Sequence, residues 1–415
     1  MPIAYHGVIE RVTSKGLGLL ADHTPPCYIP WVCEGDQVSV KRVKQTPHYH
    51  IGHVTRVNQS SAHRVLPPCH HYTRCGGCQL MHADLSYQRQ LKTQWLWETL
   101  SSHGLSPSQD RIHPMVWSDE GVSRRQLRLV FSPQGKWGIN RRHSALIEPI
   151  THCEVVPDEL NHCLSVLSQW RPCPPDQMVQ ATAAFWVMGN ARLGRIVGVP
   201  VSESEARLMH ERLGLTGSYW QPHPDHPGIS VGNHAATVRV DGIGFRVSLG
   251  SFFQGHPALI TPLVRAVMLP SAPPTVWDLY AGVGVLGRHA LARGAHSVTV
   301  IEDNPVAIAD ARVNCNGPHM QVLQSDVGHA MRDMTQAPDW VMADPPRTGL
   351  SVPVHGQLLR WRPPYLTLVH CQLDSMGRDV ARLVANGYRI DHIQPLDLFP
   401  HTIHMEVVTQ LTWAG

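Results

Sequence analysis

The sequence predicts an α/β fold for its C-terminal part, because short apolar runs there alternate with helical patterns. Five successive runs finish in residues that can carry chemistry: Asp278, Glu302, Asp326, Asp344 and Cys371. Strands that alternate with helices form a parallel sheet, and their carboxyl ends share one edge. Ligands of open α/β sheets bind at that edge. We therefore expect a functional site there.

Asp344 stands where the apolar run 340–343 meets Pro345, Pro346 and Arg347. A double proline prevents a helix from starting at once, so the acid is expected at the rim of a buried strand. An acid in that place can face a substrate. The same residues also fit a strand end that is merely capped by a turn.

Residues 282–287 have the glycine pattern of a nucleotide-binding turn. Gly282, Gly284 and Gly287 satisfy the spacing G-x-G-x-x-G, and Glu302 follows at about the distance expected of a ribose ligand. A nicotinamide-dependent dehydrogenase is therefore one interpretation. Asp278, four residues before the first glycine, and the position of the pattern deep in the chain favour S-adenosylmethionine. By itself the segment predicts only a cofactor that contains a nucleotide.

The composition fits a cytosolic protein of two or three domains. The chain has 415 residues, a net charge of +3 and 28 histidines, so its charge can rise as the pH falls toward about 6.5. No run approaches about 18 uninterrupted apolar residues, and no signal-like segment begins the chain. We expect a cytoplasmic protein without a membrane partner. Ten cysteines in such a protein suggest metal-binding or catalytic thiols more than disulfides.

The first 60 residues predict a small β-barrel. Short strands alternate there with glycine turns, at residues 7–12, 16–20, 27–30 and 37–43. Such barrels often hold single-stranded nucleic acid, and the basic residues of this segment would suit a face that follows a phosphate backbone: Lys41, Arg42, Lys44 and Arg56. A solvated pair of charged strands explains any one of them equally well.

Three cysteines close to one another give the most specific local signal. Cys69, Cys75 and Cys78 have the spacing C-x5-C-x2-C, and Cys153 is the best candidate for a fourth ligand. Four thiolates could hold zinc or an iron–sulfur cluster, and zinc could also take a histidine such as His70 or His82. The spacing does not decide between these metals.

Arginines are dense in the segment that follows. A helix is expected to begin near Leu85, and a strand over residues 123–131 contains several arginines, with Arg141 and Arg142 after the next turn. Arginines on adjacent strands suit contacts with phosphate, although an exposed, solvated sheet face is the alternative. Alternation over residues 238–248 suggests one further strand, and residues 172–217 show no chemistry that we can interpret.

Glu406 is expected at the start of a final strand rather than at its end. If that strand runs antiparallel to the others, its start lies at the same edge as their carboxyl ends. Glu406 would then join Asp344 and Cys371.

These motifs together resemble the RNA 5-methyluridine methyltransferase family over nearly the whole chain. The opening barrel is similar to a TRAM domain, and the cysteine motif resembles the four-iron cluster motif of the ribosomal-RNA branch, with Cys153 as its fourth ligand. The other matching motifs, in family order, are Phe253-Gln254, residues 278–284, residues 344–347, Cys371, and His404 to Glu406.

The resemblance implies a role for each candidate residue. Cys371 would add as a thiolate to C6 of uracil, Glu406 would act as general base on the C5 proton, and Asp344 would position the base or the cofactor. The residues implied to bind S-adenosylmethionine are Gln254, Tyr280, Gly282, Glu302, Asp326 and Asp344.

Three positions depart from the family pattern. Gln372-Leu373 replace the usual Asn-Pro after the cysteine, Gly255-His256 replace Val-Asn, and Val285 replaces an asparagine. The first change alters the loop that orients the thiolate, and the other two affect cofactor contacts.

The sequence thus predicts an S-adenosylmethionine-dependent, Rossmann-like methyltransferase domain over 251–415. An OB-like TRAM barrel over 1–60 and a central α+β domain with a [4Fe-4S] cluster over 61–250 precede it. The expected reaction is C5 methylation of a uridine in 23S rRNA, of the type of uridine 1939, with RNA rather than DNA as partner and the chain as a monomer. The alternatives are another rRNA or tRNA uridine, a dehydrogenase, or an RNA-binding protein without catalysis.

Overall fold

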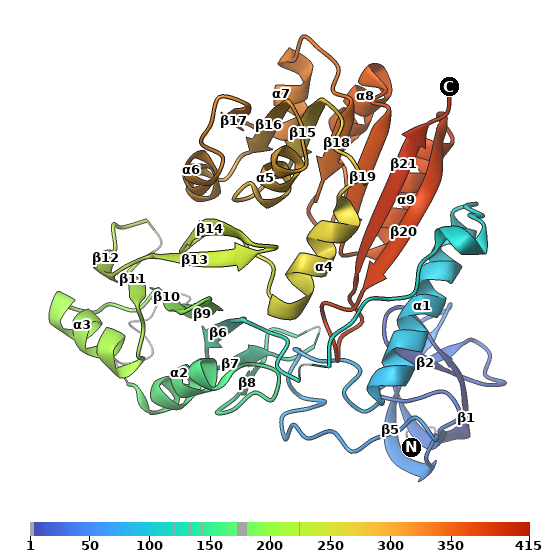
Figure 1. The fold of residues 1–415 in the computed structure, drawn as a ribbon. Coiled ribbons are helices and arrows are strands. Elements are labelled where there is room, and N and C mark those ends of the chain that lie inside the picture. Colours follow the sequence, from blue (N-terminus) through green and yellow to red (C-terminus); the bar gives the residue numbers. More distant parts are fainter. Residues whose placement is uncertain (1–3, 120, 133, 143, 172–180, 224) are drawn as a thin grey trace. The chain divides into compact units, whose positions relative to one another are not determined.

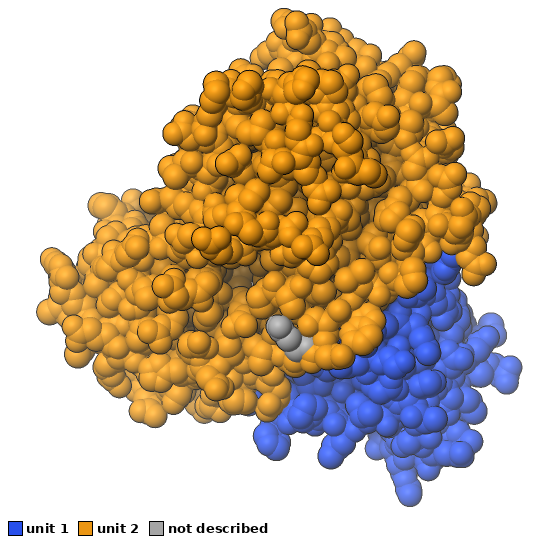
Figure 2. Space-filling view, in the orientation of Figure 1, with its two compact units in different colours: residues 1–98, 139–148, 399–404 blue, residues 99–138, 149–398, 405–415 orange. Residues whose placement is uncertain are grey.

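The computed structural model describes residues 4–119, 121–132, 134–142, 144–171, 181–223 and 225–415. The first three residues of the predicted barrel segment and part of the segment 172–217 lie outside this description. The chain divides into two compact units (Figure 2). Unit 1 consists of residues 1–98, 139–148 and 399–404, and unit 2 of residues 99–138, 149–398 and 405–415.

Unit 1 contains the predicted barrel, closed in the strand order β1-β2-β3-β5-β4. The barrel strands are β1 (Ala4–Val12), β2 (Leu17–Leu20), β3 (Cys27–Pro30), β4 (Gln37–Gln45) and β5 (His50–Gln59). Alternate residues point inward, as a half-buried strand requires, and they form one apolar core. The buried core residues are Ile9, Leu20, Cys27, Ile29, Val32, Val38 and Val40.

Helix α1 (Leu85–Ser102) begins where the sequence predicts and ties the barrel to other parts of unit 1. The indole nitrogen of Trp95 donates to the Val12 carbonyl at 2.8 Å, and the ammonium of Lys92 donates to the Phe399 carbonyl at 3.0 Å. Both side chains are fully buried. Because a buried ammonium is costly without acceptors, the Lys92 contact specifies the place of the segment 399–404.

A buried ion pair closes the barrel beside its core. The Asp36 carboxylate accepts from Arg64 Nε at 3.0 Å and from the backbone nitrogens of Cys33 and Ser61 at 2.7 and 2.9 Å. Although burial by itself would raise it, the hydrogen bonds from Arg64, Ser61 and Cys33 bring the pKa of Asp36 below its ordinary value. The carboxylate therefore stabilises the fold above its unfolded-state pKa, and this stabilisation is lost as the pH falls through the folded-state pKa.

We predict that Arg64→Met destabilises the barrel by about 3–5 kcal/mol, because it leaves the Asp36 charge buried without its partner. The double variant Asp36→Asn/Arg64→Met should recover part of that loss. Hydrogen exchange of the β1–β5 amides measures both effects, and the amides of unit 2 are the internal control. A loss below about 1 kcal/mol in the single variant would contradict the prediction.

Unit 2 begins with a mostly antiparallel sheet in the order β12-β11-β10-β9-β6, which continues into β7. The elements of this region are β6 (Gln126–Phe131), β7 (Trp137–Asn140), β8 (Ile147–Pro149), β9 (Thr182–Met188), β10 (Ala191–Val197), β11 (Gly217–Gln221), β12 (Ile229–Gly232), α2 (Asp158–Gln169) and α3 (Glu203–Arg212). A short 3-10 helix, η1 (Gln109–Arg111), precedes them. The chain over 139–148, which includes parts of β7 and β8, belongs to unit 1.

The single strand predicted over residues 238–248 is wrong. The structure has a hairpin there, β13 (Ala235–Val240) and β14 (Ile243–Ser248), joined by Asp241 and Gly242. Both turn residues have positive φ, 45° and 85°, as a two-residue hairpin turn requires. The Asp-Gly pair was the available signal, and strand-like alternation on both sides of it concealed the break.

The C-terminal sheet confirms the predicted α/β fold (Figure 1). Its order is β17-β16-β15-β18-β19-β21-β20. The strands are β15 (Thr275–Leu279), β16 (Ser297–Glu302), β17 (Met320–Gln324), β18 (Trp340–Ala343), β19 (Tyr365–His370), β20 (Tyr388–Leu396) and β21 (Glu406–Trp413). The helices are α4 (Pro257–Val267), α5 (Val285–Ala292), α6 (Pro305–Asn314), α7 (Val327–Asp333), α8 (Val352–Trp361) and α9 (Leu373–Val384).

Strands β15 to β19 pair in parallel, so the five predicted strand ends do share one edge. Strand β21 pairs antiparallel with β19 and with β20, which confirms the expected direction of the last strand. Within the described residues, none of the helices combines the length and the apolarity that crossing a membrane would need.

Candidate active site

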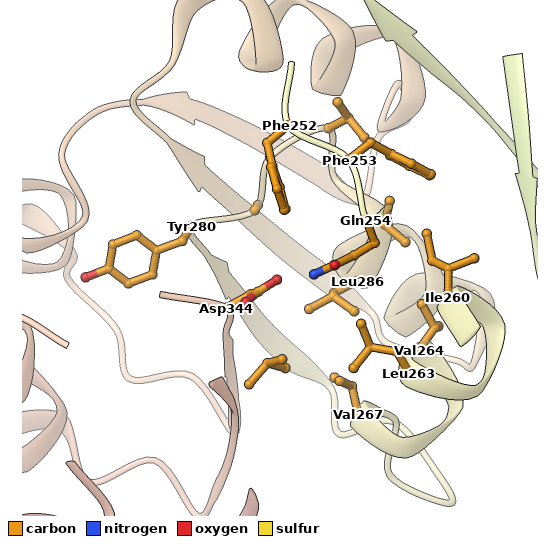
Figure 3. Close-up of a pocket in the computed structure, with 15 residues that line it drawn as sticks. Phe252, Phe253, Gln254, Ile260, Leu263, Val264, Val267, Tyr280, Leu286 and Asp344 are labelled. Atoms are coloured by element: carbon orange, nitrogen blue, oxygen red, sulfur yellow. The ribbon is translucent and has the colours of Figure 1, made fainter. Parts of the chain in front are cut away.

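A pocket of about 570 Å³, partly open to solvent, lies at the carboxyl edge of the C-terminal sheet (Figure 3). Helix α4 supplies an apolar wall, the turn after β15 a second wall, and the segment 252–254 a third. Four predicted site residues line it: Gln254, Tyr280, Gly282 and Asp344. A concave, largely apolar pocket with a few polar groups is the usual form of a cofactor site.

The turn after β15 has the backbone that its glycines predict. Gly282 and Gly284 have φ values of 55° and 84°, in the left-handed region that favours glycine, and Gly284 caps the start of α5. A side chain at Gly284 would collide with the Cys315 sulfur, whereas one at Gly282 would find only the Phe252 carbonyl, at 4.0 Å. The first glycine therefore leaves room for a ligand, and the second allows close packing.

Asp278 supports this turn from inside the sheet. Its side chain is fully buried, and one carboxylate oxygen accepts from the Gly287 nitrogen at 2.7 Å. Burial raises the pKa of Asp278 to about 7, while the Gly287 hydrogen bond opposes the shift. The acid therefore holds the first turn of α5 rather than facing a ligand.

Glu302 and Asp326 do not line the pocket. The Glu302 carboxylate, at the end of β16, accepts from the Gly282 nitrogen at 2.8 Å and from the Asn304 nitrogen at 2.9 Å. Asp326 caps helix α7 by accepting from the His329 nitrogen at 3.0 Å, and its side chain is 65% exposed. Both acids stand at the predicted edge, and their contact with a cofactor stays a prediction.

Asp344 and Gln254 meet inside the pocket (Figure 3). Burial raises the pKa of Asp344 to about 7, and a hydrogen bond with the Gln254 side chain opposes the shift. Tyr280 lies at the rim with its hydroxyl directed away from Gln254 (Figure 3), and it bonds to Ser351. The pocket thus presents a half-buried carboxyl group beside aromatic and aliphatic walls.

The strand register brings Cys371 and Glu406 together. It pairs His370 with Val407, so the next opposite positions are Cys371 and Glu406. Burial first, and then the charges of Glu406 and Asp344, raise the pKa of the Cys371 thiol to about 11. Burial and Asp344 raise the pKa of Glu406 well above its ordinary value. In the described part of the chain, Glu406 Oε2 is buried without a hydrogen-bond partner.

Comparison with known proteins agrees with this architecture. The chain is 30% identical to the 23S rRNA (uracil(1939)-C(5))-methyltransferase RlmD of Chromohalobacter salexigens, over 97% of this chain and 88% of that protein. It is 26% identical to an uncharacterized RNA methyltransferase of Listeria monocytogenes, over 97% and 96% of the two chains. Residues 268–359 match the family model described as conserved hypothetical protein 95.

A solved structure shares the fold over nearly the whole chain. The tRNA (uracil-54, C5)-methyltransferase of Pyrococcus abyssi, in complex with S-adenosyl-L-homocysteine, superposes with a TM-score of 0.77 at 24% identity. The match covers 98% of this chain and 100% of that one.

The chain belongs to the RNA 5-methyluridine methyltransferase family. The dehydrogenase interpretation of the glycine turn is thereby wrong. The reason lies in the turn itself, which serves any cofactor with a ribose, so the glycine spacing could not separate the two enzyme classes.

Two of the three departures from the pattern of this methyltransferase family can be located in the structure. Gln372 is the N-cap of α9, which begins directly at Leu373, and its carbonyl accepts from the Ser375 hydroxyl at 3.0 Å. Val285 begins α5 and lines the cofactor pocket. The helix therefore starts two residues after Cys371, without the asparagine and proline that are usual in the family.

Arg347 belongs to the site, although the sequence analysis assigned it no role. Its positive charge lowers the pKa of Cys371 and of Glu406, opposing the effect of burial at both groups. The available signal was its place directly after Asp344-Pro345-Pro346. An exposed arginine after a strand commonly has no function, so only its effect on the pKa values of Cys371 and Glu406 identifies Arg347 as part of the site.

The cysteine motif lies in a turn-rich part of unit 1 with all three thiols half-buried. The Gly77 nitrogen lies 3.4 Å from the Cys75 sulfur, so it can donate a hydrogen bond to it. Cys153 belongs to unit 2, where its backbone nitrogen donates to Asn161 Oδ1 at 2.8 Å. Among the described residues, no group of three or more His, Cys, Asp or Glu side chains is placed to hold a metal ion.

Three other residues that the sequence offered as ligands or phosphate contacts have partners within unit 1. His82 is buried with Nδ1 2.6 Å from the Tyr72 hydroxyl, and burial lowers its pKa to about 4. Arg141 pairs with Glu148 at 2.9 Å, and Arg142 donates to the Lys15 carbonyl at 2.5 Å. Both arginines therefore hold unit 1 together, which their density in the sequence did not reveal.

A second cavity adjoins the pocket within unit 2. Its volume, which includes space open to solvent, is about 880 Å³, and it shares Phe253, Gln254 and Ile260 with the pocket. Arg125, Trp186 and Arg239 also line it. The arginine-dense strand therefore supplies at least one cation, Arg125, to a cavity beside the candidate active site.

We predict that alkylation of Cys371 by iodoacetamide has a pH midpoint near the thiol pKa of about 11, well above the ordinary value of about 8.5. Glu406→Gln should lower the midpoint, because it removes a negative charge, and Arg347→Met should raise it. Mass spectrometry of the peptide that carries Cys371 separates its reaction from that of other thiols. A midpoint that stays unchanged in both variants, or moves in the same direction in both, would show that these charges do not act on the thiol.

Proposed function

We propose that this chain transfers a methyl group from S-adenosylmethionine to C5 of a uridine in 23S rRNA, of the type of uridine 1939. The observation that carries the proposal is the sheet edge where Cys371, Glu406 and Asp344 converge beside the glycine turn. The pKa values of all three groups are raised, which is typical of a catalytic site. Membership of the family supports uracil as the base that is methylated.

The pocket fits a cationic nucleoside cofactor. Gly282 leaves open space beside the backbone, the segment 252–254 contributes aromatic side chains, and Asp344 contributes a half-buried carboxyl. This carboxyl has a pKa raised to about 7, and positive charge beside it would favour its ionised form. The chemistry that S-adenosylmethionine supplies is an electrophilic methyl group on a positively charged sulfur.

Cys371 would act first, as the nucleophile. Uracil C5 is a poor nucleophile, but addition of a thiolate to C6 converts the base to an enolate whose C5 is electron-rich. In the free protein the raised pKa keeps this thiol protonated near neutral pH. Positive charge from Arg347, and from a cofactor beside Asp344 and Glu406, favours the thiolate, so the nucleophile would form only in the loaded site.

Glu406 would act last, as the general base. Once C5 carries the methyl group, its proton must leave before the bond between C6 and Cys371 can break. The buried Oε2 of Glu406 lies opposite Cys371 in the strand register, and the raised pKa makes its ionised form a stronger base than an exposed carboxylate. Removal of the C5 proton expels the thiolate and releases methylated RNA.

Two basic regions support an RNA partner. Lys41, Lys44 and Arg56 are exposed on β4 and β5 of the barrel. In unit 2, Arg125, Trp186 and Arg239 line the second cavity, and such side chains suit phosphate contact and base stacking. A base inside folded RNA must be flipped out to reach a buried thiol, so contacts of this kind would hold the displaced strand.

The specific target stays open to one alternative. The relative from Chromohalobacter salexigens is named for uridine 1939 of 23S rRNA, whereas the structural neighbour from Pyrococcus abyssi is named for uracil 54 of tRNA. We propose the ribosomal target because the chain carries both the barrel and the cysteine motif. We also propose a cytoplasmic monomer with the domain division 1–60, 61–250 and 251–415.

We further propose that Cys69, Cys75, Cys78 and Cys153 hold a [4Fe-4S] cluster. The donor set suits iron and sulfide, and the hydrogen bond from Gly77 to the Cys75 sulfur is of the kind that stabilises a ligated thiolate. This part of the proposal rests on the chemistry of the cysteines and on the family motif.

We predict methyl transfer when the anaerobically purified protein meets tritiated S-adenosylmethionine and unmodified 23S rRNA, with label at one uridine. Cys371→Ala should abolish transfer. Glu406→Gln should slow it by at least about 100-fold and accumulate a covalent complex of protein and RNA, because the adduct forms but cannot eliminate. Scintillation counting, nucleotide mapping and denaturing gels measure these outcomes.

Unmodified tRNA in a parallel reaction tests the alternative target. Label in tRNA alone would redirect the proposal to that substrate. Binding of S-adenosylmethionine without transfer to either RNA would favour the non-catalytic RNA-binding alternative, with the loop at Gln372-Leu373 as the first suspect.

We predict that the same anaerobic preparation contains about four iron atoms and matching sulfide per chain. Cys78→Ala should lose the iron. Cys163→Ala is the matched control, because this buried thiol bonds to the Leu213 carbonyl and lies outside the motif. Zinc in place of iron, in stoichiometric amount, would assign the cysteines to a zinc site instead.

A further inference from the structure

Asp379 is a buried carboxylate close to the candidate site that the proposed reaction does not use. It lies in helix α9 with a side chain that is fully buried. Four groups donate to it: the Leu350 nitrogen at 2.7 Å, His370 Nε2 at 3.1 Å, His355 Nε2 at 3.2 Å and Arg378 Nε at 3.3 Å. These donors belong to the loop after β18, to β19, to α8 and to α9 itself.

The first of these contacts fixes the loop that carries Arg347. Leu350 ends the segment that begins at Asp344, and its backbone nitrogen bonds to Asp379. The adjacent Arg378 donates through Nη2 to the Thr348 carbonyl at 2.5 Å. Between them, Gly349 has a φ of 78°, and a side chain there would overlap the Asp379 carboxylate. Two neighbouring residues of α9 therefore hold the loop directly after Arg347.

The second contact fixes the strand that carries the nucleophile. His370 is the last residue of β19 and directly precedes Cys371. Its side chain is 1% exposed, and in the described part of the chain its Nδ1 has no hydrogen-bond partner. The bond from Nε2 to Asp379 is therefore the polar contact that orients this ring. The backbone beside the thiol depends on it.

Asp379 differs in charge from the acids at the rim of the site. Although burial by itself would raise it, the hydrogen bonds from His355, His370 and Leu350 bring the pKa of Asp379 far below its ordinary value. The raised pKa values of Asp344 and Glu406 favour their neutral forms. A carboxylate that stays ionised throughout the reaction can hold its donors in fixed positions. Its two oxygens remain hydrogen-bond acceptors while the neighbouring acids gain and lose protons.

We propose that Asp379 is a positioning residue, which fixes the position of the Cys371 thiol relative to the Arg347 guanidinium. It does so because it binds both the last residue of β19 and the loop 345–350. The proposal deepens the proposed function, on which its catalytic meaning rests. A purely structural role would stabilise the domain without affecting the thiol. The direct charge effect of Asp379 has the opposite sign to the proposed one, because removing a negative charge near a thiol lowers its pKa.

The test is a double-mutant cycle that combines Asp379→Asn with Arg347→Met. The first quantity measured in each variant is the pH midpoint of Cys371 alkylation. Asparagine keeps the size of the side chain but cannot accept from all four donors. Each single variant should raise the midpoint, with alkylation at pH 9 slower by about threefold or more, and the double variant should show little further change. Full additivity, or a lowered midpoint in Asp379→Asn, would overturn the proposal.

Asp339→Asn is the matched control. Asp339 lies at the other end of β18 and accepts from the Thr275 nitrogen at 3.0 Å and from the Thr275 hydroxyl at 2.6 Å. It should reduce thermal stability without moving the Cys371 midpoint. If Asp379→Asn also lowers only the stability, the residue is structural and the proposal fails. Should that variant not fold, His355→Phe removes one donor far from the thiol and should raise the midpoint by a smaller amount.

Kinetics provide the second measurement. Asp379→Asn should lower kcat by about 10-fold to 100-fold and change the KM for RNA by less than about threefold, since the lost geometry concerns the reacting groups rather than RNA binding. A change confined to KM would also contradict the proposal. Alkylation of Cys371 does not depend on methyl transfer. If the wild-type protein proves inactive, the proposed function is rejected, but the double-mutant cycle measured by alkylation still decides the role of Asp379.

Discussion

The antiparallel pairing of β21 with β19 is the contact on which the candidate site depends. A parallel strand in that place would bring its first residue to the far edge of the sheet. Because β21 runs in the opposite direction and pairs Val407 with His370, the last residue of β19, Glu406 stands opposite Cys371, the proposed nucleophile. Tight hydrogen bonding between the two strands makes this register hard to change.

Burial then gives these groups their chemistry. Asp278 and Glu406 are buried, Asp344 and Cys371 are half-buried, and each of the four groups has a pKa raised in the direction of its neutral form. A site with several buried acids and one nearby arginine is short of positive charge. In the proposed function, a cationic cofactor would supply this positive charge, so cofactor binding and activation of the thiol would be linked by electrostatics. Asp379 complements this arrangement as the carboxylate that stays ionised.

Local patterns in the sequence predicted much of the fold and some of the site. Strand ends such as Glu302 and Asp344 follow apolar runs, and Gly282 and Gly284 have the positive φ that their spacing implies. The sequence did not show which side chains pair with one another. Arg141 pairs with Glu148 and His82 contacts Tyr72, and a ligand contact of either residue stays a prediction. The hairpin at Asp241-Gly242 was missed because alternation continues on both sides of the turn.

The sequence by itself determined which residues stand at the carboxyl ends of the strands, because alternation and turn residues act over a few neighbouring positions. It also determined the family, through several motifs in a fixed order. Only the tertiary structure decided which of these residues meet, how far their proton affinities shift, and that Arg347 and Asp379 belong to the same arrangement. Desolvation, strand register and hydrogen bonds between distant segments exist only after the chain has packed, so no local pattern encodes them.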